Sequence, residues 1–207
     1  MKFILFVEGY TKDKALPFFF KKWLDPKLND PIGIKTVRFE GWTELVKDAP
    51  LKAKMHLSGP YKDDIVAVIS LLDLYGPTFY PNNLKGCDER YKWAKLDIED
   101  KVNHPKFFQF FAVHEVEAWL LSQPELFPLE LKNAFPKKIQ KPETVNFNEP
   151  PAKLLGRLYP MHMKRSYKKV VNGKELFGRL DPNIAYQKCP KLKELLDKML
   201  ELAQQPH

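Results

Sequence analysis

Short, strongly apolar segments alternate with amphipathic ones through the first half of the chain. Three apolar, β-prone runs, each bounded by polar or turn residues, predict buried strands at 3–7, 65–72 and 107–113. The mixed segment 32–39 predicts a further strand between the first two. Because the strands are separated by helical patterns, the sequence predicts an α/β protein with a mostly parallel sheet and helices on both faces.

Helical spacing of apolar residues predicts helices over 11–24, 42–57 and 88–102, with another starting near Glu117. Thr11 is the expected N-cap of the first helix, and Pro17 should be tolerated only near its start. Pro50 is expected to break or kink the second helix, and Leu96 is an expected apolar position of the third.

The texture of the sequence changes from about residue 124. Proline and lysine become frequent and clear strand patterns disappear. We therefore expect residues 1–123 to form the α/β core and residues 124–207 to form a helical, Lys- and Pro-rich C-terminal extension packed on it. The last helix, expected over 190–202, carries leucines and a methionine on one face, which should point into the core.

Acidic residues follow the apolar strands at equivalent positions. Glu8 ends the first run, Asp73 ends the second, and Glu115 and Glu117 follow the third. A single acid after a strand is more often a solvated turn residue or a helix cap. Because parallel strands place their carboxyl ends at one edge, where α/β proteins bind ligands, these acids together predict a site. Clustered carboxylates of this kind bind hard cations such as Mg²⁺.

Glu115 and Glu117 leave a local alternative open. Two positions apart, they would share a face on a strand and diverge on a helix, so the junction decides which one points inward. We favour Glu117 slightly over Glu115. The neighbouring His114 is more often a hydrogen-bonded structural residue than a ligand in such a position.

Charge favours an anionic partner. The 207 residues include 34 Lys and Arg against 26 Asp and Glu, a net charge of +8. Nucleic acid is the obvious partner, although a solvated basic surface gives the same balance. Lys164, Arg165, Lys168 and Lys169 form a basic segment that could neutralise phosphates, with Tyr167 stacking on a base. These lysines and Lys153 are also candidates to stabilise charge on a reacting phosphate.

The remaining composition predicts a cytoplasmic protein. Its two cysteines, Cys87 and Cys189, are too few for a disulfide framework and lack metal-ligand spacing, so both are expected to be reduced structural thiols. No apolar run is long enough to span a membrane, and a strand pattern begins at once where a signal peptide would lie.

Several motifs, in order, resemble the TOPRIM-type fold. These are FVEGYT, DLYG and VHEVEAWLL, at residues 6–11, 73–76 and 113–121. More narrowly, they resemble a family of small bacterial TOPRIM-like proteins often encoded beside AAA-type ATPases. The resemblance continues through NFNEPPAKLL at 146–155, the basic segment with Gly173, and the Cys189-Pro190 pair, so it covers nearly the whole chain.

The resemblance implies a TOPRIM-like (Rossmann-like) sheet and a metal-dependent nuclease acting on DNA or RNA. Mg²⁺ or Mn²⁺ would be held by Glu8, Asp73, Glu115 and Glu117, and the implied catalytic residues are Glu8, Asp73, Glu117 and Lys169. It also implies that nucleic acid is the substrate, with an AAA-type ATPase as partner in a bacterial defence-type system. Lys153, Lys164, Arg165, Lys168 and Lys169 are the expected nucleic-acid contacts.

Two residues depart from the TOPRIM pattern. Tyr75 stands where these proteins usually carry a second aspartate, and Lys12 stands where many relatives have a glutamate. Lys12 could be an exposed first-turn lysine, an ion-pair partner of Glu8, or a contact to the substrate. Its charge would leave one well-formed metal site in place of two. The alternative function is a catalytically degenerate binding or regulatory module that docks on an ATPase.

Overall fold

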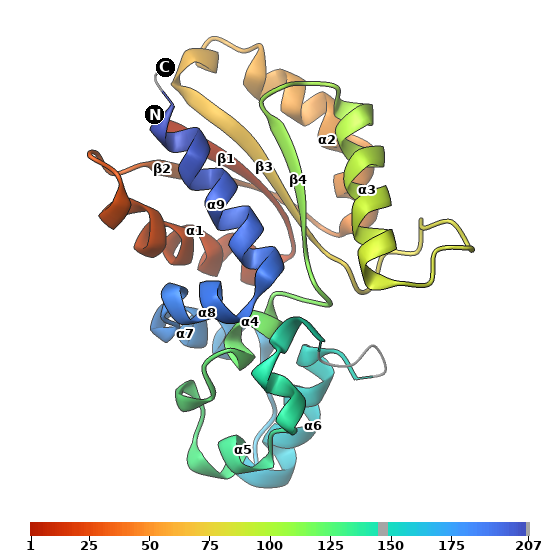
Figure 1. Cartoon of the computed structure of the whole chain (residues 1–207), viewed down its shortest axis with the longest axis vertical. Coiled ribbons are helices and arrows are strands. Elements are labelled where there is room, and N and C mark those ends of the chain that lie inside the picture. The colour runs from red at the N-terminus through yellow and green to blue at the C-terminus, as the bar shows by residue number, and fades with distance from the viewer. Residues whose placement is uncertain (145–148, 206–207) are drawn as a thin grey trace.

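A four-stranded parallel sheet forms the centre of the molecule in a computed structural model that describes residues 1–144 and 149–205 (Figure 1). The strands are β1 (Lys2–Glu8), β2 (Gly33–Phe39), β3 (Ile65–Asp73) and β4 (Phe107–Ala112). They lie in the order β2-β1-β3-β4, and each adjacent pair is parallel. This confirms the predicted α/β class and the predicted parallel sheet.

Helices make up most of the remaining chain. The α-helices are α1 (Tyr10–Leu24), α2 (Trp42–Leu57), α3 (Cys87–Val102), α4 (Glu117–Leu121), α5 (Leu129–Ala134), α6 (Pro151–Met163), α7 (Lys169–Arg179), α8 (Pro182–Lys188) and α9 (Pro190–Gln204). Short 3₁₀ turns lie at Asp25–Lys27, Lys62–Asp64, Pro124–Leu126, Lys137–Gln140 and Pro142–Thr144.

Both faces of the sheet are covered. Alternate residues of β1 point to opposite faces, so Ile4 and Phe6 join a cluster with α2 and α3, while Phe3 and Leu5 join a larger one with α1 and α9. Met199 of α9 belongs to that larger cluster, so the C-terminal helix packs on the sheet (Figure 1). The division of the chain at residue 123 stays a prediction.

Several local details of the helices differ from the predictions. Gly9, not Thr11, precedes the first helix, because its φ of 74° lies in the left-handed region that glycine adopts without strain. Pro17 lies in the middle of α1 and not near its start, since burial of residues on both sides of it outweighs the lost backbone hydrogen bond. Pro50 lies inside α2, which continues across it, so the predicted break is absent and a kink stays a prediction. Leu96 is 60% exposed, because other residues of α3 face the sheet.

Two further observations concern the whole chain. In the described ranges, no helix has both the length and the apolar character needed to cross a bilayer. Cys87 is half-buried and Cys189 is buried, and both are free thiols. Burial raises the pKa of the Cys87 thiol to about 11, and it also raises the pKa of the Cys189 thiol well above its ordinary value. Neither thiol is therefore activated as a nucleophile.

Candidate functional site

The acids predicted from the strand ends lie at one edge of the sheet. Glu8 is the last residue of β1 and Asp73 the last of β3, and β1 and β3 are parallel neighbours. The backbone N–H of Asp73 donates a hydrogen bond to Oε1 of Glu8 over 3.1 Å. The structure therefore brings Glu8 and Asp73 together at this edge.

Lys12 lies between the two carboxylates. Its Nζ is 3.0 Å from Oε1 of Glu8 and 2.8 Å from Oδ2 of Asp73, and the side chain is only 4% exposed. Burial by itself lowers the pKa of Lys12, but the charges of Asp73 and Glu8 reverse this effect and the pKa is raised. Lys12 is therefore a charged bridge. Of the alternatives left open for it, the ion pair with Glu8 is observed and the exposed first-turn lysine is not.

Asp73 also fixes the segment after β4. Its Oδ1 accepts a hydrogen bond from the backbone N–H of Val116 over 3.1 Å. His114, buried with a φ of 64°, turns the chain just before this contact, and its carbonyl accepts the Tyr75 N–H over 2.9 Å. Positive φ is strained for a residue with a side chain, so the surrounding contacts hold this turn in place.

Glu115 and Glu117 meet on a second lysine. Lys169, at the start of α7, places Nζ 3.2 Å from Oε1 of Glu117 and 3.6 Å from Oε1 of Glu115. Oε2 of Glu115 accepts the backbone N–H of Ala152 over 2.9 Å. Both acids therefore point inward. Glu117 is the first residue of α4, and Glu115 lies just before this helix.

Glu117 is the most strongly perturbed acid of the site. Its side chain is fully buried, and Oε2 lacks a hydrogen-bond donor within the part of the chain that the structure describes. Burial raises the pKa of Glu117 to about 7; Lys169 opposes this rise, whereas the charges of Asp73 and Glu115 add to it. Burial lowers the pKa of Lys169, but Glu117, Asp73 and Glu115 outweigh it and the pKa is raised.

The four acids fit a hard cation in chemistry, but each pair is already bridged by an ammonium group. Across residues 1–144 and 149–205, no group of three or more His, Cys, Asp or Glu side chains is arranged to hold a metal ion. A divalent ion would therefore have to displace a lysine amine from its carboxylates. Metal binding by Glu8, Asp73, Glu115 and Glu117 stays a prediction.

A pocket of about 380 Å³ opens beside these groups. Its lining includes Glu8, Asp73, Lys12 and Lys169 together with the aromatic residues Tyr10, Trp42 and Tyr75. The Nζ of Lys153 lies 3.3 Å from the Tyr75 hydroxyl, so α6 also reaches the pocket wall.

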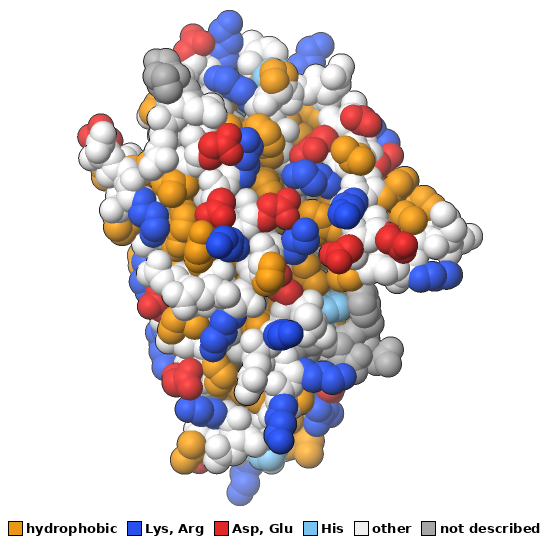
Figure 2. Space-filling model, viewed as in Figure 1, with side chains coloured by type: hydrophobic (Ala, Val, Ile, Leu, Met, Phe, Trp, Pro, Cys, Tyr) orange, Lys and Arg blue, Asp and Glu red, His pale blue; other side chains and the backbone are white. Residues whose placement is uncertain are grey.

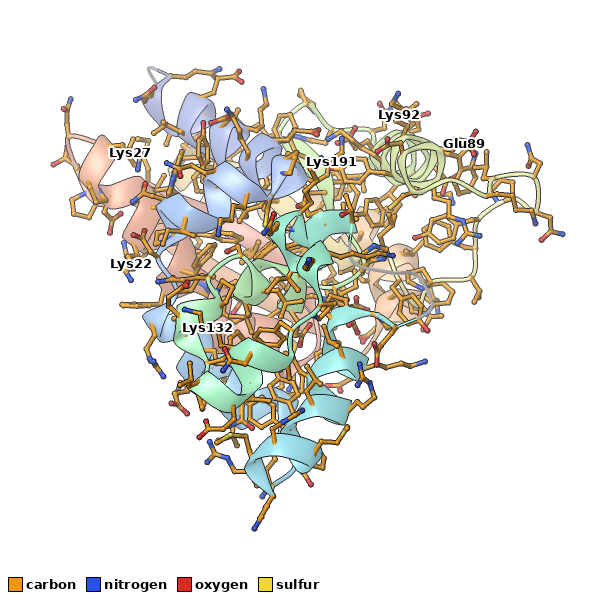
Figure 3. All side chains as sticks on the ribbon, turned by 60° about the horizontal axis from the view of Figure 1, so that its bottom comes forward. Lys22, Lys27, Glu89, Lys92, Lys132 and Lys191 are labelled. Carbon is orange, nitrogen blue, oxygen red and sulfur yellow. The ribbon has the colours of Figure 1, made fainter. Side chains whose placement is uncertain are left out.

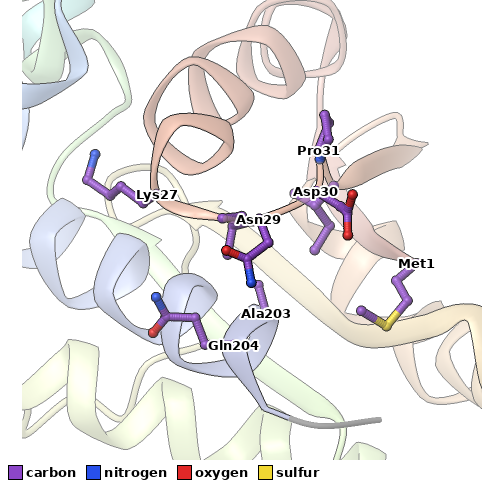
Figure 4. A pocket seen from close by; sticks show the side chains of 9 residues that line it. Met1, Lys27, Asn29, Asp30, Pro31, Ala203 and Gln204 are labelled. Carbon is purple, nitrogen blue, oxygen red and sulfur yellow. The ribbon is translucent and has the colours of Figure 1, made fainter.

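A second hollow, of about 440 Å³, is lined by Met1, Asp30 and Gln204 among others (Figure 4). It lies at the amino ends of β1 and β2, because Met1 directly precedes β1 and residues 30–32 directly precede β2. It is therefore separate from the carboxylate site.

The other predicted phosphate contacts lie next to Lys169 in sequence. Lys164, Arg165 and Lys168 are exposed. Tyr167, by contrast, packs its ring on Tyr159 with centroids 5.1 Å apart, and its hydroxyl is buried. The stacking of Tyr167 on a base stays a prediction, and this packing leaves only part of its ring accessible. Residues 146–148 of the NFNEPPAKLL motif lie outside the described residues.

Basic side chains are not gathered on one element. In Figure 2 they predominate over the lower part of the molecule, which carries α5 and α6, while both signs mix over α9 and α3. Figure 3 shows Lys22, Lys132 and Lys191 on separate elements. The charge pattern therefore does not by itself select a nucleic-acid face.

One acid at the same edge was missed. Glu40 follows the last residue of β2 and lines the pocket, and it is followed by Gly41. The Glu40-Gly41 pair repeats the Glu8-Gly9 pattern, so the signal was present in the sequence. Glu40 is 80% exposed and pairs with Arg38 over 2.9 Å, which separates it from the inner acids.

The fold and the site define an α/β protein with a carboxylate–lysine cluster at the carboxyl edge of a parallel sheet. The chain belongs to the family described as a domain of unknown function (DUF4276), whose model matches residues 7–200. No curated protein matches it. Among solved structures, it is similar to the C-terminal region of the Burkholderia pseudomallei OLD protein. That match covers 97% of this chain and 98% of the other, with 19% identity and a TM-score of 0.50.

These comparisons agree with the predicted fold and add a similarity in fold to the OLD protein region. At 19% identity the likeness concerns the fold alone. The narrower TOPRIM assignment therefore stays a prediction.

Proposed function

We propose that this protein is a metal-dependent nuclease that cleaves phosphodiesters of DNA or RNA at the carboxylate–lysine cluster. The observation that supports this most strongly is the pairing of Glu8 and Asp73 on Lys12 beside an open pocket. Glu115 and Glu117 meet on Lys169, which lines the same pocket. Buried carboxylates are costly to a fold, and an acid with a strongly raised pKa in a cleft is typical of a functional site.

The four acids would hold Mg²⁺ or Mn²⁺, which when bound activates water and neutralises charge on the phosphate. Without the ion, Lys12 bridges Glu8 and Asp73 and holds the two side chains close together. Lys169 is 43% exposed on its side chain, so it can meet a phosphate arriving from solvent. Lys153, Lys164, Arg165 and Lys168 would contact the strand backbone, which sets the register of the substrate.

The charges of the cluster favour one ion. Four carboxylates and two lysines leave two formal negative charges, which one divalent cation balances. A second divalent cation would face the ammonium groups of Lys12 and Lys169 in a region of low dielectric constant. This supports the single metal site expected from the lysine at position 12.

The physiological setting is also part of the proposal. The sequence resemblance supports a cytoplasmic effector that works with an AAA-type ATPase in a bacterial defence-type system. The likeness to a region of the OLD protein is compatible with this setting.

The test is a cleavage assay with single-stranded DNA, duplex DNA and RNA, in Mg²⁺, Mn²⁺ or EDTA, with and without the neighbouring ATPase. We expect cleavage that requires the divalent ion. Absence of cleavage under every one of these conditions would contradict the proposal.

One observation favours the alternative, a binding module without catalysis. Lys12 already satisfies Glu8 and Asp73 at 3.0 and 2.8 Å. In that case the native chain would bind nucleic acid without cleaving it. The Lys12→Met variant, which removes the ammonium group between the two carboxylates, would show neither metal binding nor cleavage. Metal-dependent cleavage by the native chain excludes this alternative.

A further inference from the structure

Trp42 forms a rigid aromatic wall of the pocket beside the carboxylates. It is the first residue of α2, and its ring packs against Phe79 with centroids 5.6 Å apart. Phe79 is supported in turn by Tyr80 and Trp93, with centroids 4.8 and 5.9 Å away. The indole is therefore held from behind and remains half-buried at the pocket.

Two tyrosines complete the aromatic lining. Tyr75 is fixed by Lys153, which lies 3.3 Å from its hydroxyl and 5.7 Å from its ring centroid. Tyr10 is 47% exposed, and Arg38 and Lys14 lie 5.5 and 5.3 Å from its ring centroid. Each of these two pocket-lining tyrosines therefore has a cationic side chain beside its ring.

This lining suits a ligand with a planar face and an adjacent anionic group. A volume of about 380 Å³ lies within the range of small-ligand pockets and is sufficient for one nucleotide. Lys169 and Lys153 offer charge to a phosphate, while the indole offers a stacking surface that accepts any base.

We propose that this pocket receives one unpaired nucleobase of the strand, stacked on Trp42, while the adjoining phosphate lies toward Lys169. The inference rests on the proposed function, because it places the same strand that the acids would cleave. A base within a duplex must first leave its stack, which costs free energy. The protein should therefore prefer single strands, or duplexes with unpaired bases, over intact duplexes.

The test measures binding in EDTA, so that it does not depend on cleavage. Fluorescence anisotropy is recorded for a labelled single strand and its duplex, in both deoxy and ribo forms, with native protein, Trp42→Ala and Trp42→Phe. Tyr61→Ala is the control, because Tyr61 is 69% exposed and does not line the pocket.

We expect Trp42→Ala to weaken single-strand binding about tenfold, the low-to-middle range for loss of one stacked base. Trp42→Phe should retain most of the affinity, and Tyr61→Ala should change nothing. Duplex binding should be unaffected by Trp42→Ala. Equal loss for single strand and duplex, or no loss for either, would overturn the inference.

An abasic strand provides the second measurement, which needs no variant that could misfold. Removing the bases while keeping the phosphates should weaken binding to the native protein about as much as Trp42→Ala does. Unchanged affinity for the abasic strand contradicts base stacking. Cleavage that survives Trp42→Ala equally on all substrates would remove the inference and leave the nuclease proposal intact. Base stacking without any cleavage would support the inference and contradict the nuclease proposal.

Discussion

Glu117 begins α4 with its carboxylate fully buried, and its pKa is raised to about 7. In the unfolded chain this group titrates near 4.5. Between these two pH values the folded state binds the proton more tightly than the unfolded state. The contribution of Glu117 to stability is therefore present below about pH 4.5 and is lost as the pH rises toward 7.

The substitution Glu117→Gln should remove this loss of stability at higher pH. At pH 8 we expect the variant to be more stable than the native protein, by at most about 3 kcal/mol, because the substitution eliminates an unfavourable buried charge. Urea unfolding at pH 5 and pH 8 measures the effect. Glu201→Gln, at an acid that is 56% exposed, is the control and should behave as native. A Glu117→Gln variant less stable than native at pH 8 would show that the ion pair with Lys169 dominates.

At the scale of single residues, the sequence predicted that Glu8 and Asp73 lie at the same edge of the sheet, but it left the contacts of Lys12 undecided. Glu8 and Asp73 meet because strand ends in a parallel sheet are fixed by register, which apolar runs reveal. The direction of Lys12 depends on how α1 leaves β1. That exit is set by the φ of 74° at Gly9, which no periodicity encodes.

Helix α7 carries Lys169 into the site, and its position depends on close contact with α1. A Cβ atom added at Gly173 would lie 2.9 Å from the Thr11 methyl group. Thr11 is itself buried, so it has little room to move. Gly173 thus allows α7 to approach the helix that carries Lys12.

Gly173→Ala should destabilise the protein by about 1–2 kcal/mol, because the added methyl group overpacks this contact. Gly178→Ala is the matched control in the same helix, since an added Cβ meets nothing within 4 Å there. It should be neutral or stabilising by about 0.5 kcal/mol, as alanine favours the helix. Denaturant unfolding of both variants checks the pair. Equal effects of the two changes would contradict the close approach of α7 to α1.

Elements were predicted best where the apolar pattern was long. The second helix was expected over 42–57 and is observed as Trp42–Leu57. Its Pro50 was expected to break or kink it, and the break is absent, because Leu45, Ala49 and Ala53 are buried on both sides of the proline and keep the helix continuous. Burial against other elements cannot be inferred from the helix propensity of the residues around the proline.

The whole molecule combines a net charge of +8 with an acidic cluster at one edge of its sheet. Nucleic-acid binding through Lys164, Arg165 and Lys168 should weaken steeply as salt rises, because each neutralised phosphate releases counterions. Replacing Lys164 and Lys168 by alanine should flatten the slope of log K against log salt by about two for a duplex.

Lys54 and Lys62 provide the control for this measurement. Both are exposed, and they lie at the end of α2 and just before β3, at the opposite end of the sheet. Replacing them should leave the slope unchanged. If both double variants flatten it equally, the binding is a property of the overall charge and not of the 164–168 segment.

The fold class of the molecule followed from the order of apolar and amphipathic segments, and the structure confirms it. The resemblance implied that Lys169 acts with these acids, but residue spacing alone could not predict how α6 and α7 meet the sheet edge, because Lys169 and Ala152 reach Glu115 from segments far along the chain. Such long-range contacts depend on how the C-terminal helices pack, which sequence spacing does not specify.

Cleavage by the native chain and by Asp73→Asn, compared at equal Mg²⁺ or Mn²⁺ concentration, tests the central claim most directly. The side chain of Asp73 contacts Lys12 and the backbone N–H of Val116, and the backbone N–H of Asp73 donates a hydrogen bond to the Glu8 carboxylate. We expect Asp73→Asn to lower the cleavage rate at least about a hundredfold, and Asp63→Asn, an exposed acid at the opposite end of the sheet, to leave it unchanged. Equal cleavage by a folded Asp73→Asn variant would contradict the assignment of this cluster as the active site.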